Sequence, residues 1–156
     1  MEISIRKMNA RDEAQVLAMM RVFYRSPAVR TEGSEEIYLR DFRLCVGDSP
    51  YLEGYMLERE GAVCGYAMVA KSFSTEFGKP CIYVEDLYLL ESARGRGIGS
   101  AFFAFLGRQY PDAVFRLEVE QENIPAIRLY RKMGYTPSPY LEMKMLSCPQ
   151  PGDGSI

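Results

Sequence analysis

Residues 88–103 read YLLESARGRGIGSAFF and place glycine and arginine alternately between an apolar run and an amphipathic run. Glycine in a helix's first turn costs up to about 1 kcal/mol relative to alanine. We therefore expect that some function of this segment requires backbone without side chains. A strand that enters a glycine-rich turn and then a helix leaves backbone N–H groups directed at one point. Arg94 and Arg96 add positive charge beside them. The segment therefore predicts a site for a ligand with more than one phosphate charge.

The spacing excludes the two commonest phosphate-binding loops. A nucleotide P-loop requires lysine after its last glycine, and here Ser100 follows Gly99. The dinucleotide fingerprint G-x-G-x-x-G does not fit either, because Gly95, Gly97 and Gly99 are spaced two and two. The structural alternative is a loop that is rich in glycine only because it must turn.

Composition limits the class of protein. The chain has 156 residues, 47% of them hydrophobic and 26% charged, which indicates one globular domain; we expect it to span residues 1–146, with 147–156 as a flexible tail. A formal charge of −2 without a basic stripe argues against a nucleic-acid partner. No apolar run approaches the roughly 20 residues of a membrane span, and the N-terminus lacks a signal-peptide pattern, so we expect a cytoplasmic protein without a membrane partner.

The sequence contains no histidine, and its four cysteines are scattered singly. Three cysteines lie within apolar runs, which favours buried free thiols over a zinc site, so we expect no metal. Ser-His and Cys-His catalytic pairs are excluded because they need histidine. Acid-base chemistry must then come from carboxylates, tyrosine, lysine, cysteine or water.

Hydrophobic periodicity predicts an α/β (α+β) fold with a sheet of six or seven strands and about four helices. Turn and capping signals separate the elements, and no repeat or linker divides them. The expected strands and helices are a strand at 3–5, a helix after Asn9, a helix capped by Ser34, a hairpin over 51–71 turning at Glu60 and Gly61, a strand at 81–90, a helix at 100–110, a strand at 113–120, a helix capped by Asn123, and a closing strand at 140–146.

The motifs resemble those of the GNAT superfamily of N-acetyltransferases, which bind acetyl-coenzyme A (acetyl-CoA). RGRGIG at 94–99 matches that family's Arg/Gln-x-x-Gly-x-Gly/Ala pyrophosphate loop. VEDLYLLESARGRGIGSAFF followed by LEVEQENIPAIRLYRKMGY resembles two consecutive core motifs of the family, over about residues 80–136. Within the family, EDL before the loop and N...A..LY after it look most like the spermidine/spermine-type and other small-amine members. The resemblance implies a mixed, mostly antiparallel sheet that splays at the cofactor strand.

The resemblance also implies which residues hold acetyl-CoA. Backbone amides of the loop, together with the Ser100 hydroxyl or amide, would bind the pyrophosphate, and one strand would pair through its backbone with the pantetheine arm. Asn123 would contact pantetheine, and Tyr130 would lie near the thioester sulfur. The expected cofactor residues are Leu87, Tyr88, Leu89, Arg94, Gly95, Arg96, Gly97, Ile98, Gly99, Ser100, Asn123 and Tyr130.

Acetylation of an alkyl amine requires a base, since an amine with a pKa near 10 is almost wholly protonated at pH 7. Glu85, on the cofactor strand, is the preferred base, acting directly or through a water; burial would have to raise its pKa. Asp86 is the alternative, and the two point to opposite faces of a regular strand. By alternation Glu85 shares a face with Leu87 and Leu89, although a bulge would reverse this. A structural role, as a buried strand carboxylate bonded to backbone amides, stays open.

Tyr130 is the expected general acid for the departing thiolate, by concerted transfer or as a hydrogen bond only. Core packing with its helix neighbours is the structural alternative. For the acceptor amine, Glu85 could attract a cation together with four loop glutamates, Glu32, Glu35, Glu36 and Glu76. For the four loop glutamates, a solvated acidic surface is the commoner explanation.

The sequence thus predicts an acyltransferase that moves an acetyl group from acetyl-CoA to a primary amine of a small molecule. A polyamine, an amino acid or an aminated antibiotic would fit as acceptor. A protein N-terminus or lysine is the alternative acceptor, and a non-catalytic acyl-CoA-binding module is the alternative from another class. The closing strand at 140–146 would be an edge, which motivates the further expectation of a homodimer.

Overall fold

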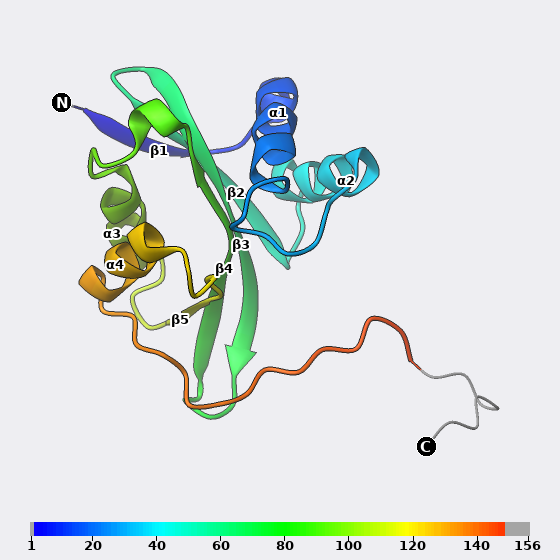
Figure 1. Cartoon of the computed structure of the whole chain (residues 1–156), viewed down its shortest axis with the longest axis vertical. Coiled ribbons are helices and arrows are strands. Elements are labelled where there is room, and N and C mark those ends of the chain that lie inside the picture. The colour runs from blue at the N-terminus through cyan, green and yellow to red at the C-terminus, as the bar shows by residue number, and fades with distance from the viewer. Residues whose placement is uncertain (1, 149–156) are drawn as a thin grey trace.

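Within residues 2–148, five strands form one sheet in which neighbours in sequence are also neighbours in space, in the order β1-β2-β3-β4-β5. The computed structural model describes residues 2–148 (Figure 1). The first four strands pair antiparallel, and β5 pairs parallel to β4. The strands are β1 (Ile3–Lys7), β2 (Leu52–Arg59), β3 (Ala62–Ser74), β4 (Lys79–Leu89) and β5 (Val114–Leu117).

In the described part of the chain, four α-helices cover the sheet, two on each face (Figure 1). One apolar core lies under α1 and α2 and includes Met20, Phe42 and Tyr66. The other lies under α3 and α4 and includes Val69 and Phe102. The predicted mixed, mostly antiparallel sheet flanked by about four helices is therefore confirmed. The helices are α1 (Glu13–Phe23), α2 (Glu35–Val46), α3 (Ile98–Gln109) and α4 (Ile124–Lys132), with short 3-10 helices η1 (Ala10–Asp12) and η2 (Glu91–Ala93).

Local signals in the sequence set the element boundaries. Asn9 caps η1 and Ser34 caps α2, each accepting a backbone N–H. The turn between β2 and β3 places Glu60 at φ 53° and Gly61 at φ 77°, the left-handed pair that a two-residue hairpin turn needs. These predictions are confirmed, because each depends on residues close together in the chain.

The closing strand predicted at 140–146 is wrong for the described chain. Residues 140–146 form no helix or strand, so the sheet has five strands rather than six or seven. Alternation of apolar and polar residues makes a strand only where another strand supplies hydrogen bonds, and none does so here. Of the predicted flexible tail, residues 149–156 lie outside the described part.

The sheet opens between β4 and β5. Their pairing runs from Cys81 opposite Val114 to Val84 opposite Leu117, where β5 ends. β4 continues to Leu89 with only β3 beside it. At the point of opening, Met68 pairs with Asp86 and Val69 with Val84, which leaves Glu85 as the extra residue of a bulge. The opening and the bulge together position the candidate site.

None of the described helices is long and apolar enough to cross a bilayer. Residues 2–148 also hold no group of three or more acidic, cysteine or histidine side chains able to bind a metal ion.

Candidate active site

The glycine-rich loop runs directly into the N-terminus of α3. Gly95 has φ 71° and Gly97, the N-cap of α3, has φ 81°, conformations that glycine adopts without strain. The first helical hydrogen bond is donated by Ala101 to Gly97, so the amides of Ile98, Gly99 and Ser100 have no helical acceptor. An anion bound here would accept from those amides and be stabilised by the helix dipole.

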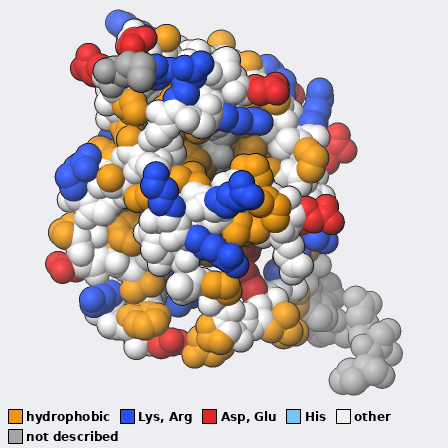
Figure 2. All heavy atoms as spheres, turned by 60° about the vertical axis from the view of Figure 1, so that its left-hand side comes forward, with side chains coloured by type: hydrophobic (Ala, Val, Ile, Leu, Met, Phe, Trp, Pro, Cys, Tyr) orange, Lys and Arg blue, Asp and Glu red, His pale blue; other side chains and the backbone are white. Residues whose placement is uncertain are grey.

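Positive charge surrounds this helix end. Figure 2 shows Lys and Arg side chains gathered on the face that carries α3 and α4, around a hollow. The exposed cations of the loop and of α4 are Arg94, Arg96, Arg128, Arg131 and Lys132. Arg94 Nε donates to the carbonyl of Leu89 and Arg96 Nε to that of Ser92, each over 3.1 Å. The first bond holds the loop against the end of β4, and the second holds it against η2.

Gly99 has a packing role that its sequence context did not reveal. A Cβ at this position would lie 2.7 Å from Leu129 Cδ2, so α3 and α4 meet at a point where only a hydrogen fits without adjustment. The absence of a side chain at Gly99 therefore serves the contact between two helices as well as the open backbone of the loop.

We expect Gly99→Val to lower the free energy of unfolding by about 1–3 kcal/mol, because the added methyl groups overpack the contact with Leu129. The matched control is Gly107→Val on the same helix, where a Cβ would meet nothing within 4 Å. Urea unfolding of both variants checks this; equal losses at the two positions would contradict it.

The free edge of β4 lies between the bulge and the loop. Residues 85–89 carry β3 on one side only, since β5 has already ended. Leu87 and Leu89 pack with the α3 core, whereas Tyr88, 8% exposed, packs with the α1 and α2 core. An extended ligand with amide groups could pair along this edge as an added strand. Its far end would then reach the N-terminus of α3.

The bulge gives the two neighbouring carboxylates different surroundings. Asp86 is 3% exposed, and its oxygens accept hydrogen bonds from Tyr24 and Tyr66, both at 2.8 Å. Burial raises the pKa of Asp86 to about 6 against the opposing effect of those two bonds. Glu85 is exposed. Asp86 is therefore held inside the protein, and Glu85 is the carboxylate that a substrate can approach.

The pKa of Glu85 is raised, chiefly by partial burial and then by the negative charges of Asp86 and Glu118. Asp41 on α2 contributes as well, and burial raises its own pKa. A glutamate with a raised pKa is a stronger base than an ordinary one. Its acidic surroundings also favour an approaching cation.

Tyr130 lies on α4 and lines a groove of about 1010 Å³ beside β5. Its ring meets Phe103 edge-on at 5.6 Å between centroids and Tyr135 at 6.0 Å. Burial raises its pKa, which keeps the phenol protonated. The hydroxyl of Tyr135 is buried without a partner among the described residues. Tyr130 thus has the packing role considered from the sequence and also borders an open space.

Asn123 caps α4, its side chain accepting from the amide of Ala126 over 3.4 Å. Pro125 occupies the first turn of that helix. The structure gives Asn123 this capping role; a contact with pantetheine stays a prediction.

The other predicted substrate carboxylates are not brought together. Glu32 is exposed in the loop between α1 and α2, and Glu76 borders the groove beside β5. Glu35 pairs with Arg21 of α1, so its charge is already balanced. That loop also reaches across the molecule, where Arg30 Nη2 donates to Glu120 Oε2 over 3.0 Å just beyond β5.

Sequence reasoning missed three residues of the acidic region: Asp41, Tyr24 and Tyr66. Tyr38 and Cys45 belong to the apolar stripe of α2. Asp41 lies three residues after the first and four before the second, and therefore falls within that stripe. A carboxylate within an apolar stripe is a signal that could have found it. The tyrosines followed the apolar pattern and gave no separate signal.

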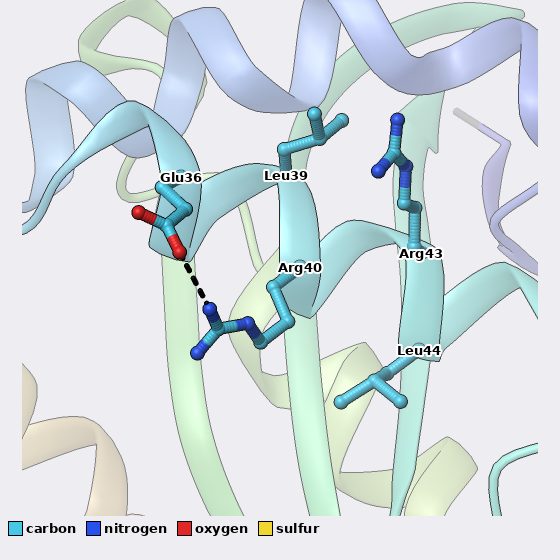
Figure 3. Close-up of a pocket in the computed structure, with 5 residues that line it drawn as sticks. All are labelled: Glu36, Leu39, Arg40, Arg43 and Leu44. Carbon is cyan, nitrogen blue, oxygen red and sulfur yellow. Dashed lines mark hydrogen bonds and ion pairs between the residues drawn. The ribbon is translucent and has the colours of Figure 1, made fainter.

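A second hollow lies on α2 and shares no residue with the candidate active site (Figure 3). It measures about 380 Å³, and all its lining residues come from that one helix: Glu36, Leu39, Arg40, Arg43 and Leu44. Glu36 and Arg40 form an ion pair at 2.7 Å across it. A balanced ion pair on one helix face offers no group for catalysis.

Comparison with protein families decides the assignment. Residues 16–135 match the sequence profile of the Acetyltransferase (GNAT) family, which is more than half of the chain. The chain belongs to the GNAT acetyltransferase family. A comparison with curated protein sequences gave no match.

Solved structures share the GNAT fold along almost the whole chain. A possible acetyltransferase from Clostridium difficile 630 superposes with a TM-score of 0.78 at 17% identity, covering 94% of this chain and 98% of that one. AAC(6')-Iy in complex with the bisubstrate analogue CoA-S-monomethyl-acetylneamine gives 0.73 at 15%, covering 95% and 100%. A ribosomal-protein-alanine N-acetyltransferase from Brucella melitensis biovar Abortus 2308 gives 0.72 at 14%, covering 93% and 99%.

Proposed function

We propose that this GNAT protein transfers the acetyl group of acetyl-CoA to a primary amine of a small molecule, by direct attack in a ternary complex. The observation that carries the proposal is the free edge of β4 at residues 85–89, which leads from the exposed Glu85 to the N-terminus of α3. A linear cofactor with amides in its middle and phosphates at one end matches that layout.

The loop would hold the pyrophosphate and β4 the pantetheine arm. The unpaired amides of Ile98, Gly99 and Ser100 would donate to phosphate oxygens, with Arg94 and Arg96 adding charge. The backbone beside Leu87 and Leu89 would pair with the pantetheine amides. When bound, acetyl-CoA supplies an acetyl group activated as a thioester.

Glu85 would remove the proton that the amine must lose before it attacks, directly or through a water. The attack forms the new C–N bond and releases the thiolate of CoA. Tyr130 would donate a hydrogen bond to that thiolate, or its proton in a concerted transfer. Its raised pKa keeps the hydroxyl protonated for the hydrogen bond but makes complete transfer of the proton less favourable. Asp86, held by two tyrosines, would shape the electrostatic field without touching the substrate.

A small cationic amine is the acceptor class that the acidic surroundings of Glu85 favour. By analogy, AAC(6')-Iy in complex with the bisubstrate analogue CoA-S-monomethyl-acetylneamine supports an amine-bearing small molecule as the acceptor. A protein N-terminus is the second candidate acceptor, supported by the similarity to a ribosomal-protein-alanine N-acetyltransferase.

We expect Tyr130→Phe to lower kcat about tenfold, which corresponds to one lost hydrogen bond to the leaving group at about 1.4 kcal/mol. Tyr135→Phe is the matched control, because it removes a neighbouring hydroxyl that is buried without a partner. Steady-state kinetics of thiol release should show little change in that control. An unchanged kcat in Tyr130→Phe would remove Tyr130 from the mechanism.

The function itself is tested by thiol release from acetyl-CoA over a panel of polyamines, amino acids, aminoglycosides and short peptides. Turnover with small amines and none with peptides supports the proposal. Turnover with peptides only would favour the protein acceptor. If the protein binds CoA but no amine of the panel leads to release of the CoA thiol, a non-catalytic acyl-CoA-binding module would be favoured.

A further inference from the structure

The α1–α2 loop, residues 24–34, is attached to both sides of the opening in the sheet. Near the end of α1, the hydroxyl of Tyr24 donates to Asp86 of β4 over 2.8 Å. Six residues further along, Arg30 forms an ion pair with Glu120, just beyond the end of β5. In Figure 1 the loop leaves α1, bends over the sheet and returns to α2. The loop therefore spans the opening between β4 and β5.

The Tyr24 attachment lies beside the proposed base. Asp86 follows Glu85 directly in sequence and is 3% exposed, so the hydrogen bond that it accepts from Tyr24 is shielded from water. A hydrogen bond in the protein interior is stronger than one in water. Tyr24 is also the C-cap of α1, which packs on the sheet. This end of the loop is therefore the fixed end.

The Arg30 attachment is at the surface. Arg30 Nη2 and Nε donate to the two carboxylate oxygens of Glu120, and the side chain of Arg30 is 83% exposed. Glu120 itself belongs to a turn that leads into α4, because its carbonyl accepts from the amide of Asn123 over 2.9 Å. An exposed ion pair shifts an equilibrium by less than about fivefold and weakens in salt. This contact can therefore break and form again while the Tyr24 end stays attached.

Little chain lies between the two attachments. The six residues from Tyr24 to Arg30 reach about 20 Å at most, even fully extended. Ser26 shortens this reach by folding the segment: its hydroxyl accepts from the amide of Ala28 and its carbonyl from the amide of Val29, both over 3.3 Å. While both attachments are made, the loop cannot move away from the opening.

We propose that the ion pair between Arg30 and Glu120 limits the size of the acceptor amine, by holding the α1–α2 loop across the opening that leads to Glu85. The proposal rests on the proposed function, because it concerns the acceptor of the same acetyl transfer. A small amine reaches Glu85 beneath the closed loop. A bulky acceptor, such as a peptide whose chain continues beyond its amine, requires the loop to leave Glu120. The ion pair thereby makes the protein select small amines.

Acceptor preference tests the proposal. The quantity measured is kcat/KM for the largest amine that the wild type acetylates, divided by kcat/KM for the smallest. Arg30→Gln and Glu120→Gln should each raise this ratio by about two- to fivefold, the shift expected from the loss of one exposed ion pair. The charge-exchanged variant, Arg30→Glu with Glu120→Arg, should restore the wild-type ratio because the pair can form again. Arg40→Gln, which removes the exposed ion pair with Glu36 on α2, is the matched control and should keep that ratio.

Hydrogen exchange measures the loop without any acceptor. The backbone amides of the α1–α2 loop should exchange about two- to fivefold faster in Glu120→Gln than in the wild type, and at the wild-type rate in the charge-exchanged variant. High salt should speed this exchange in the wild type but not in Glu120→Gln, where no pair is left to screen.

The two measurements separate this proposal from the proposed function. An acceptor ratio that is unchanged in both single variants, a charge-exchanged variant that does not restore it, or loop exchange that Glu120→Gln does not alter would overturn the role of the ion pair and leave acetyl transfer standing. Absence of thiol release with every amine, in the wild type and the variants alike, would contradict the proposed function and this proposal with it.

Discussion

Glu85→Gln should lower kcat by about 10²–10⁴, the range over which a positioned general base contributes. Glutamine keeps the size of the side chain at the bulge of β4 but cannot accept the proton of an ammonium group. CoA binding should be nearly unchanged, because the amides that we propose bind the pyrophosphate lie at the other end of the free β4 edge. The measurement is steady-state kinetics with the best amine of the panel.

The pH profile gives the same prediction a second readout. The raised pKa of Glu85 means that its carboxyl group is protonated, and inactive as a base, at pH values where an ordinary glutamate is ionised. Activity of the wild type should therefore rise with pH through that raised pKa, and Glu85→Gln should lose this acidic limb. Glu36→Gln, on the outer face of α2, is the control and should match the wild type. Retention of the limb in Glu85→Gln would assign it to another group.

Asp86→Asn should change how stability depends on pH. Folding raises the pKa of this carboxyl from 3.8 to about 6 because it is buried. The folded state therefore holds the proton more tightly, and its contribution to stability is complete below about pH 4 and is lost as the pH rises through 6. Each pH unit between the two pKa values is worth about 1.4 kcal/mol, so the loss reaches about 3 kcal/mol.

Urea unfolding at pH 4 and pH 7 measures this effect. Relative to Asp86→Asn, the wild type should be less stable at pH 7 than at pH 4 by about 3 kcal/mol, since asparagine does not ionise. Asp112→Asn, an exposed aspartate, should follow the wild type at both pH values. A difference between wild type and Asp86→Asn that is independent of pH would show that Asp86 does not titrate as proposed.

The sequence predicted well whatever depends on neighbouring residues. The glycine-rich loop, the Ser34 and Asn123 caps and the turn at Glu60 and Gly61 follow from local conformational preferences, and the structure contains each. The order of strands and helices followed for the same reason. The site loop was therefore predictable together with the helix that it begins.

Features that depend on pairing between distant segments were harder to predict. Regular alternation would place Glu85 on the face of Leu87 and Leu89, but the register between β3 and β4 skips one residue there and makes Glu85 the bulge. No pattern within β4 encodes that offset. The segment 140–146 has the alternation of a strand, yet a strand also needs a partner edge, which lies outside its own sequence.

The central claim is that the free amides at the start of α3 bind the diphosphate of a thioester carrier. Isothermal titration calorimetry with CoA and with acetyl-CoA tests it most directly. Inorganic phosphate, added as a competitor, is the control for simple anion binding. We expect one CoA bound per chain. We also expect weaker binding in Gly97→Val, because valine is strained at the φ of 81° that Gly97 adopts and would distort the loop. No heat of binding for either ligand in the wild type would contradict it.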